Sequence, residues 1–124
     1  MTGKILLVDD EPDILKTVQK LLWVNGYETD IATDGKEALE KIFGNPPLLI
    51  VLDIMMPNVN GYQVCRAVRE NPDTQSIPII MLTAKAQNFD KFWGEEVGAT
   101  IYLTKPFDNK ELINIISEQL GKTN

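Results

Sequence analysis

Acidic side chains follow two apolar segments of the chain, at the point where each segment ends. Asp9 and Asp10 come directly after Lys4–Val8, and Asp53 comes directly after Leu48–Leu52. Two carboxylates about 4 Å apart repel each other by about 4 kcal/mol at an effective dielectric constant of about 20, so a cluster of the three favours a bound cation. Carboxylate oxygens that are too few to enclose an ion suit Mg²⁺, which keeps several of its water ligands.

A hydroxyl group and an ammonium group follow two further apolar segments. Thr83 comes directly after Ile77–Leu82, and Lys105 follows shortly after Ile101–Leu103. A phosphoryl group carries a charge of roughly −1.5 to −2, which a metal ion, an ammonium and a hydroxyl can neutralise and bind together. A carboxylate among these groups can act as the nucleophile and form an aspartyl phosphate. The residue types therefore predict phosphoryl chemistry at the carboxyl ends of strands, where open α/β sheets bind their ligands.

These side chains can meet only if the apolar segments are parallel strands of one sheet. The predicted strands are Lys4–Val8, Glu28–Ala32, Leu48–Leu52, Ile77–Leu82 and Ile101–Leu103. Apolar positions at helical spacing follow each strand, and the predicted helices begin near Pro12, Asp34, Asn60, Phe89 and Asp108. This alternation predicts an α/β fold, a parallel sheet with helices on both faces and right-handed crossovers. Because no linker or repeat interrupts it, we expect a single domain over residues 1–124.

Composition excludes several classes of function. The net charge of −6 argues against direct binding of nucleic acid or an anionic membrane, both of which attract clustered Lys and Arg. The chain contains no histidine, which excludes zinc sites built on His, Ser-His-Asp triads and a phosphohistidine carried by this chain. With one cysteine and no apolar run of about 18 residues, it has neither a disulfide framework nor a predicted membrane span. We therefore expect a cytoplasmic protein.

Four motifs, VDDEPD, VLDIMMPNVNG, MLTA and YLTKPF, occur in this order along the chain. In their order and spacing the sequence resembles the receiver domains of two-component response regulators over essentially its whole length. The resemblance implies a flavodoxin-like, doubly wound (βα)5 fold whose five-stranded parallel sheet has the order 2-1-3-4-5. It also implies a signalling switch and not an enzyme, with at most slow loss of its own phosphate. Its partner would be a histidine kinase or a histidine phosphotransfer protein.

The resemblance also assigns roles to the strand-end residues. Asp53 is the implied phosphoacceptor. The implied magnesium ligands are Asp9, Asp10, Asp53 and the backbone carbonyl of Met55. The residues implied to bind the phosphoryl group or to respond to it are Thr83, Lys105 and Tyr102. The KPF motif further implies a cis bond between Lys105 and Pro106.

A possible partner face departs from the family's pattern. Receiver domains that dimerise through their fourth helix, fifth strand and fifth helix carry a lattice of charges there. In this chain Trp93, Ile101 and Ile115 stand at positions that are commonly charged. Three apolar residues on one face would form a patch of the kind that marks a binding surface. We therefore expect this face to bind an apolar surface of an effector or a second copy of the chain.

Simpler interpretations and other functions remain open at this point. Asp9 or Asp10 could cap a helix, Thr83 could only satisfy backbone groups, and Tyr102 could be ordinary core. A phosphohydrolase of the haloacid-dehalogenase type also uses a strand-end Asp and Mg²⁺, but it places a second Asp two residues later, where this chain has Met55. A flavin-binding flavodoxin needs a phosphate loop after the first strand, where acidic residues would repel the phosphate. The sequence does not name the kinase or the effector, or decide between a stand-alone regulator and part of a longer one.

Overall fold

A parallel sheet with helices on both faces forms the protein. The computed structural model describes residues 3–56, 58–83 and 98–121. The five strands are β1 (Lys4–Val8), β2 (Glu28–Ala32), β3 (Leu49–Asp53), β4 (Ile79–Thr83) and β5 (Ile101–Thr104). They are parallel and lie in the order β2-β1-β3-β4-β5, which confirms the predicted topology.

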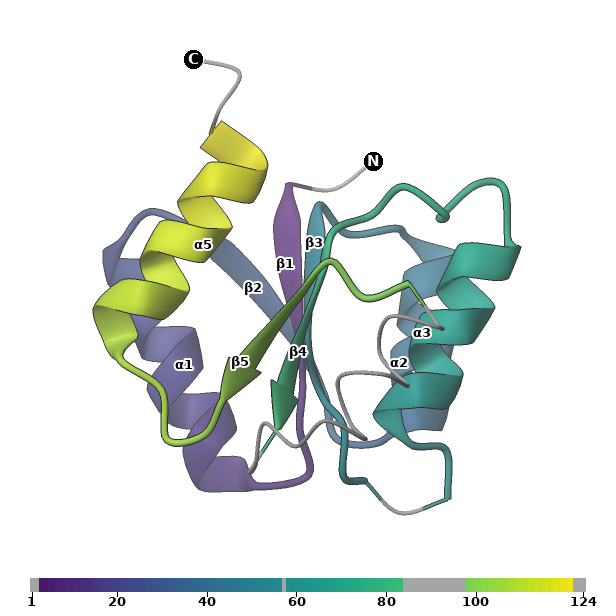
Figure 1. The fold of residues 1–124 in the computed structure, drawn as a ribbon, viewed down its shortest axis with the longest axis horizontal. Coiled ribbons are helices and arrows are strands. Elements are labelled where there is room, and N and C mark those ends of the chain that lie inside the picture. Colours follow the sequence, from purple (N-terminus) through teal and green to yellow (C-terminus); the bar gives the residue numbers. More distant parts are fainter. Residues whose placement is uncertain (1–2, 57, 84–97, 122–124) are drawn as a thin grey trace.

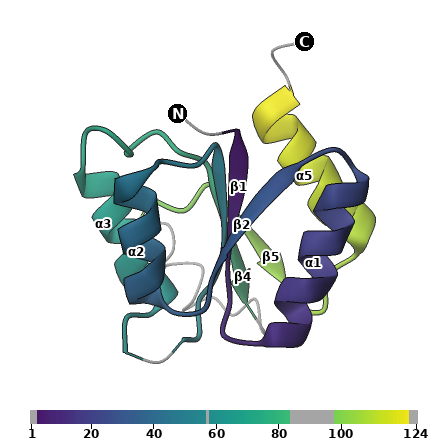
Figure 2. The same ribbon diagram turned by 180° about the vertical axis from the view of Figure 1, so that it is seen from behind.

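Four helices are seen in the described part of the chain. They are α1 (Pro12–Val24), α2 (Gly35–Gly44), α3 (Gly61–Glu70) and α5 (Asn109–Gly121). Helices α1 and α5 cover one face of the sheet, and α2 and α3 cover the other (Figures 1 and 2). The helix predicted to begin near Phe89 lies outside the described residues. No helix in the described ranges is both long and apolar enough to cross a membrane.

Strand β3 shows how the sequence builds the two cores. Its five residues are all buried, as expected for a central parallel strand. Because side chains alternate along a strand, Ile50 and Leu52 join the apolar cluster under α2 and α3, whereas Leu49 and Val51 join the cluster under α1 and α5. The apolar run that marks this strand in the sequence therefore supplies both faces of the sheet.

Helix starts follow the predicted capping residues in three places. The Asp34 side chain accepts from the Glu37 N–H, and Asn60 and Gln63 form a reciprocal capping box. Asp108 accepts a hydrogen bond from the backbone N–H of Lys110 at the start of α5. These bonds satisfy backbone donors that have no partner within the helix.

Three predicted strands end one residue further towards the functional end of the sheet, and for β5 this last residue is Thr104. Strand β3 extends to Asp53 and β4 to Thr83, because Asp53 pairs with Leu82 and Thr83 pairs with Thr104 in the ladder. Both polar residues are therefore the last residues of their strands and are held by the ladder itself. The Lys105–Pro106 peptide bond, directly after β5, is cis as predicted.

Candidate metal and phosphoryl site

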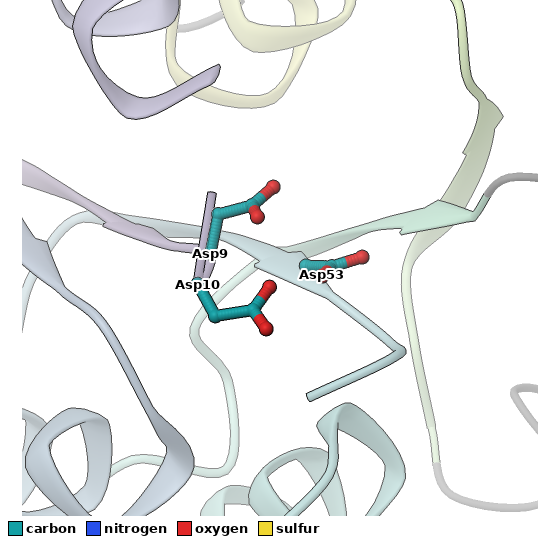
Figure 3. A group of neighbouring side chains, drawn as sticks. All are labelled: Asp9, Asp10 and Asp53. Atoms are coloured by element: carbon teal, nitrogen blue, oxygen red, sulfur yellow. The ribbon is translucent and has the colours of Figure 1, made fainter. Parts of the chain in front are cut away.

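Three carboxylates meet at the ends of β1 and β3. These strands are neighbours in the sheet, so Asp9 and Asp10, which follow β1, lie beside Asp53 at the end of β3 (Figure 3). One carboxylate oxygen from each residue lies within 4.8 Å of the others. Asp9 and Asp53 are buried, whereas Asp10 is exposed. The sequence-based expectation that these side chains converge is thus met by the geometry.

Lys105 lies against this acidic cluster from the end of β5. Its Nζ lies 3.0 Å from an oxygen of Asp9, 3.3 Å from Asp53 and 3.4 Å from Glu11. The Lys105 backbone N–H donates to the Thr83 carbonyl, which fixes the start of the turn after β5. Glu11 was not predicted as part of the site, although its place directly after Asp9 and Asp10 was a usable signal.

The first turn of α1 shows that the simpler interpretation of Asp9 or Asp10 as a helix cap is wrong. The residue that caps α1 is Glu11, and its side chain makes no capping hydrogen bond. Asp9 instead accepts from the Glu11 backbone N–H at 2.9 Å, and its other oxygen bonds Lys105. Neither Asp9 nor Asp10 is therefore the helix cap, and the carboxylate of Asp10 projects into the acidic cluster.

Burial and charge shift the pKa values of the two central groups. Burial, followed by the neighbouring Asp9 carboxylate, raises the pKa of Asp53 from its ordinary value of 3.8 to about 6, although Lys105 and the Met55 N–H oppose the shift. Burial by itself lowers the pKa of Lys105, but the hydrogen bonds and charges of Asp9 and Asp53 outweigh it, and the pKa is raised. Lys105 therefore stays charged at neutral pH, while three carboxylates share its single positive charge.

The donor set fits a magnesium ion. The carboxylates of Asp9, Glu11 and Asp53 lie around one ammonium, and that of Asp10 lies beside Asp9 and Asp53, so the site carries excess negative charge in a partly buried place. A divalent cation would offset the repulsion between Asp9 and Asp53, which adds to burial in raising the pKa of Asp53. Asp9, Asp10 and Asp53 offer only hard oxygen ligands, and their number leaves positions for water, which is the arrangement that Mg²⁺ favours.

The loop after β3 brings α3 close to the site. The Gly61 N–H donates to the Ile54 carbonyl, and a Cβ atom at Gly61 would lie 2.6 Å from the backbone oxygen of Asp53. Only glycine fits this approach. Within the loop, Met55 is 72% exposed, and its backbone N–H hydrogen-bonds to Asp53. The Met55 residue is therefore largely in solvent, while its backbone lies beside the buried carboxylate.

The other predicted residues occupy different environments. Thr83 is buried at the end of β4, on the same edge as Asp53. Tyr102 is half-buried and packs against the cluster under α2 and α3. Ile101 is half-buried on β5, and Ile115 is half-buried against the cluster under α1 and α5. Trp93 lies outside the described residues, so the predicted partner face is seen only in part.

The sheet order and the strand-end cluster together define a flavodoxin-like α/β protein with an acidic site at the carboxyl edge of its sheet. Residues 5–117 match the family model of the response regulator receiver domain. The chain belongs to this family, whose members act in two-component regulatory systems.

Individual relatives agree with this assignment. The chain is 44% identical over 119 residues to the response regulator ArlR of Staphylococcus saprophyticus, a match that covers 96% of this chain and 53% of ArlR. It is 42% identical over 113 residues to the protein PilG of Pseudomonas aeruginosa, covering 91% of this chain and 84% of PilG. The solved structure of the Vibrio cholerae chemotaxis protein CheY4 superposes with a TM-score of 0.90 at 36% identity, covering 97% of this chain and all of that one. The chain spans about half the length of ArlR and of several similar response regulators.

Proposed function

We propose that this chain accepts a phosphoryl group on Asp53 from the phosphohistidine of a histidine kinase or a histidine phosphotransfer protein. The observation that carries the proposal is a buried carboxylate at the end of β3, 3.3 Å from the Lys105 ammonium and beside the carboxylates of Asp9 and Asp10. An oxygen of Asp53 attacks phosphorus, the phosphorus–nitrogen bond of the donor breaks, and the released imidazole takes up a proton from solvent. The product is an aspartyl phosphate.

Each surrounding residue has a part in this transfer. Asp9, Asp10, Asp53 and the Met55 carbonyl would hold Mg²⁺, which, when bound, supplies positive charge for the transferring oxygens. Lys105 turns its ammonium from the Asp53 carboxylate to a phosphoryl oxygen, and the Thr83 hydroxyl donates to another. The exposed side chain of Met55 offers no hydrogen bond to orient an attacking water, so the chain keeps its phosphate as a signal and turns over no substrate.

The signal leaves through the face that contains β5 and α5. Tyr102 lies at the junction between this face and the core, and its rotation would couple the charge on Asp53 to the surface that carries Ile101 and Ile115. The partner would be an effector with an apolar surface or a second copy of the chain, and Trp93 would join the same face. The net charge of −6 disfavours direct binding of nucleic acid, and the proposed location is the cytoplasm.

Phosphorylation by a small donor tests the acceptor assignment. The protein is incubated with acetyl phosphate and Mg²⁺, and the modified residue is located by mass spectrometry. We expect one phosphoryl group on Asp53, lost in Asp53→Asn and retained in Asp34→Asn, a control in which the aspartate caps α2 and is not one of the three clustered carboxylates. Chelation of Mg²⁺ should abolish labelling. Equal labelling of Asp53→Asn and the parent would refute the assignment.

A panel of purified histidine kinases then tests the donor. We expect rapid transfer from one or a few of them, and none to Asp53→Asn. Turnover of free phosphate esters without a labelled protein intermediate would instead favour a phosphohydrolase.

A further inference from the structure

A groove of about 770 Å³ lies between the outer side of α1 and the start of β2, away from the strand-end site. Lys16, Lys20 and Trp23 line it from α1, and Lys4 and Glu28, the first residues of β1 and β2, line it from the sheet. Figure 2 shows α1 and β2 next to each other at this side of the molecule. Lys4 and Glu28 begin their strands, whereas Asp9 follows the end of β1, so the sheet side of the groove lies at the opposite edge of the sheet from the strand-end site.

The α1 side of the groove is one continuous stripe. Lys16, Gln19, Lys20 and Trp23 are spaced i, i+3, i+4 and i+7, which places them on a single face of the helix. Gln19 donates to the Thr29 hydroxyl at 3.1 Å and so ties the stripe to β2. Trp23 is 73% exposed, the highest value among the exposed large apolar side chains in the described ranges. An indole in this position is available to a partner and contributes little to the core.

The charge of the groove is opposite to that of the chain. Its three lysines and one glutamate give +2, whereas the whole chain carries −6, so the remainder carries −8. Lys16 and Lys20 form no ion pair with any residue in the described parts of the chain. The groove therefore attracts carboxylates, whereas the net negative charge of the rest of the chain repels them.

Part of the outer edge of β2, near its carboxyl end, is occupied by side chains. The Ile31 N–H donates to the Asp30 carboxylate at 2.9 Å, and the Ile31 carbonyl accepts from the Lys41 ammonium. Lys41 also forms an ion pair with Asp30 at 3.1 Å, which holds both side chains over the edge. At Ile31 an added strand would therefore find no unbonded backbone group of β2.

We propose that this groove binds an acidic segment of a partner protein that carries one aromatic or long apolar side chain. Carboxylates of the segment pair with Lys16 and Lys20, and the apolar side chain packs on Trp23, a residue type that often dominates binding energy. Duplex nucleic acid and an anionic membrane present extended negative surfaces, which the remaining charge of −8 would repel. A short peptide meets only the basic groove. The groove shares no residue with the strand-end site.

A peptide titration tests the proposal on the intact protein. The probe is a fluorescently labelled peptide of twelve residues, glutamates with one central phenylalanine, followed by anisotropy at low salt. The double variant Lys16→Glu with Lys20→Glu should weaken binding at least tenfold, and Trp23→Ala at least fivefold. A control double variant, Lys36→Glu with Lys110→Glu, makes the same charge change on exposed positions of α2 and α5 and should change binding less than twofold.

Other outcomes would overturn the proposal. They are an absence of peptide binding at low salt, an equal loss in the control variant, and equal binding of an all-glutamate peptide. Tighter binding of phosphatidylserine vesicles or duplex DNA through Lys16 and Lys20 would also overturn it. Circular dichroism establishes that each variant is folded, and acetyl phosphate labelling of Asp53 should be unchanged in all of them, which separates failure here from failure of the proposed function.

Discussion

The buried charge of Asp53 should destabilise the protein, and its removal should stabilise it. The pKa of Asp53 is raised from 3.8 to about 6, which corresponds to about 3 kcal/mol of unfavourable free energy for the ionised form at neutral pH. Asp53→Asn removes this charge with little change of shape. Lys105 then loses one of its partners, so we expect a net gain of about 1–3 kcal/mol in the free energy of unfolding at pH 7 without Mg²⁺. For a chain of this length the melting temperature should rise by roughly 4–12 °C.

The raised pKa of Asp53 also determines how the stability of the parent changes with pH. Between pH 3.8 and about 6 the folded protein binds more protons at Asp53 than the unfolded chain does, so the parent loses stability as pH rises through this window. The ionisation of Asp53 costs the parent no stability below pH 3.8, and its full destabilising effect is present once the pH passes the folded pKa of about 6. The advantage of Asp53→Asn over the parent should therefore be largest above about pH 6 and fall by about half near pH 5.

Urea unfolding of the two proteins at about pH 7.5 and about pH 5 measures this difference. The matched control is Asp10→Asn, which removes the same charge from an exposed carboxylate of the same cluster and should change stability by less than about 0.5 kcal/mol. Added Mg²⁺ should stabilise the parent more than Asp53→Asn, because the ion relieves the repulsion that the variant lacks. A variant less stable than the parent at both pH values would refute the reasoning.

Substitutions at three other positions should have distinct effects. Met55→Asn should speed hydrolysis of the phosphorylated protein, measured as loss of label, because an exposed amide beside Asp53 can orient water; unchanged or slower loss would contradict this. Gly61→Ala should lower stability by about 1–3 kcal/mol in urea unfolding, because its Cβ would lie 2.6 Å from the Asp53 backbone oxygen; an unchanged midpoint would contradict the close approach. Arg69→Ala should lower the free energy of unfolding by about 2–3 kcal/mol, because the guanidinium donates to the carbonyls of Gly98 and Ile77 at 2.7 and 2.8 Å. Arg69→Gln should lower it by a smaller amount. Equal stability of the parent and both variants would contradict this prediction.

The strand-end residues were predictable because parallel strands share one direction. Asp9, Asp53 and Lys105 each follow an apolar run of strand length, so the fold brings them to one edge whatever the details of packing. The strand limits were less certain. Asp53 belongs to β3 because its backbone pairs with Leu82, and that register depends on a strand distant in the sequence.

Contacts between long side chains and distant groups could not be predicted. Arg69 connects α3 to the segment before β5 by donating to Gly98, and no local pattern marks it for this role. Glu11 reaches Lys105 across 94 residues of sequence. The apolar character of Ile115 suggested a binding surface, but the structure packs part of this side chain against the core, which helical spacing by itself does not distinguish.

The three carboxylates that share the Lys105 ammonium link the stability of the protein to the proposed function. An ammonium has three N–H donors, and Lys105 lies within 3.4 Å of the carboxylates of Asp9, Glu11 and Asp53. An arriving phosphoryl group carries more charge than any one carboxylate and so competes for these donors. In the proposed reaction the charge moves from the buried Asp53 carboxylate to the phosphoryl oxygens, where Lys105 can pair with it. The unfolding experiment on Asp53→Asn measures how much the buried charge of Asp53 destabilises the unmodified protein.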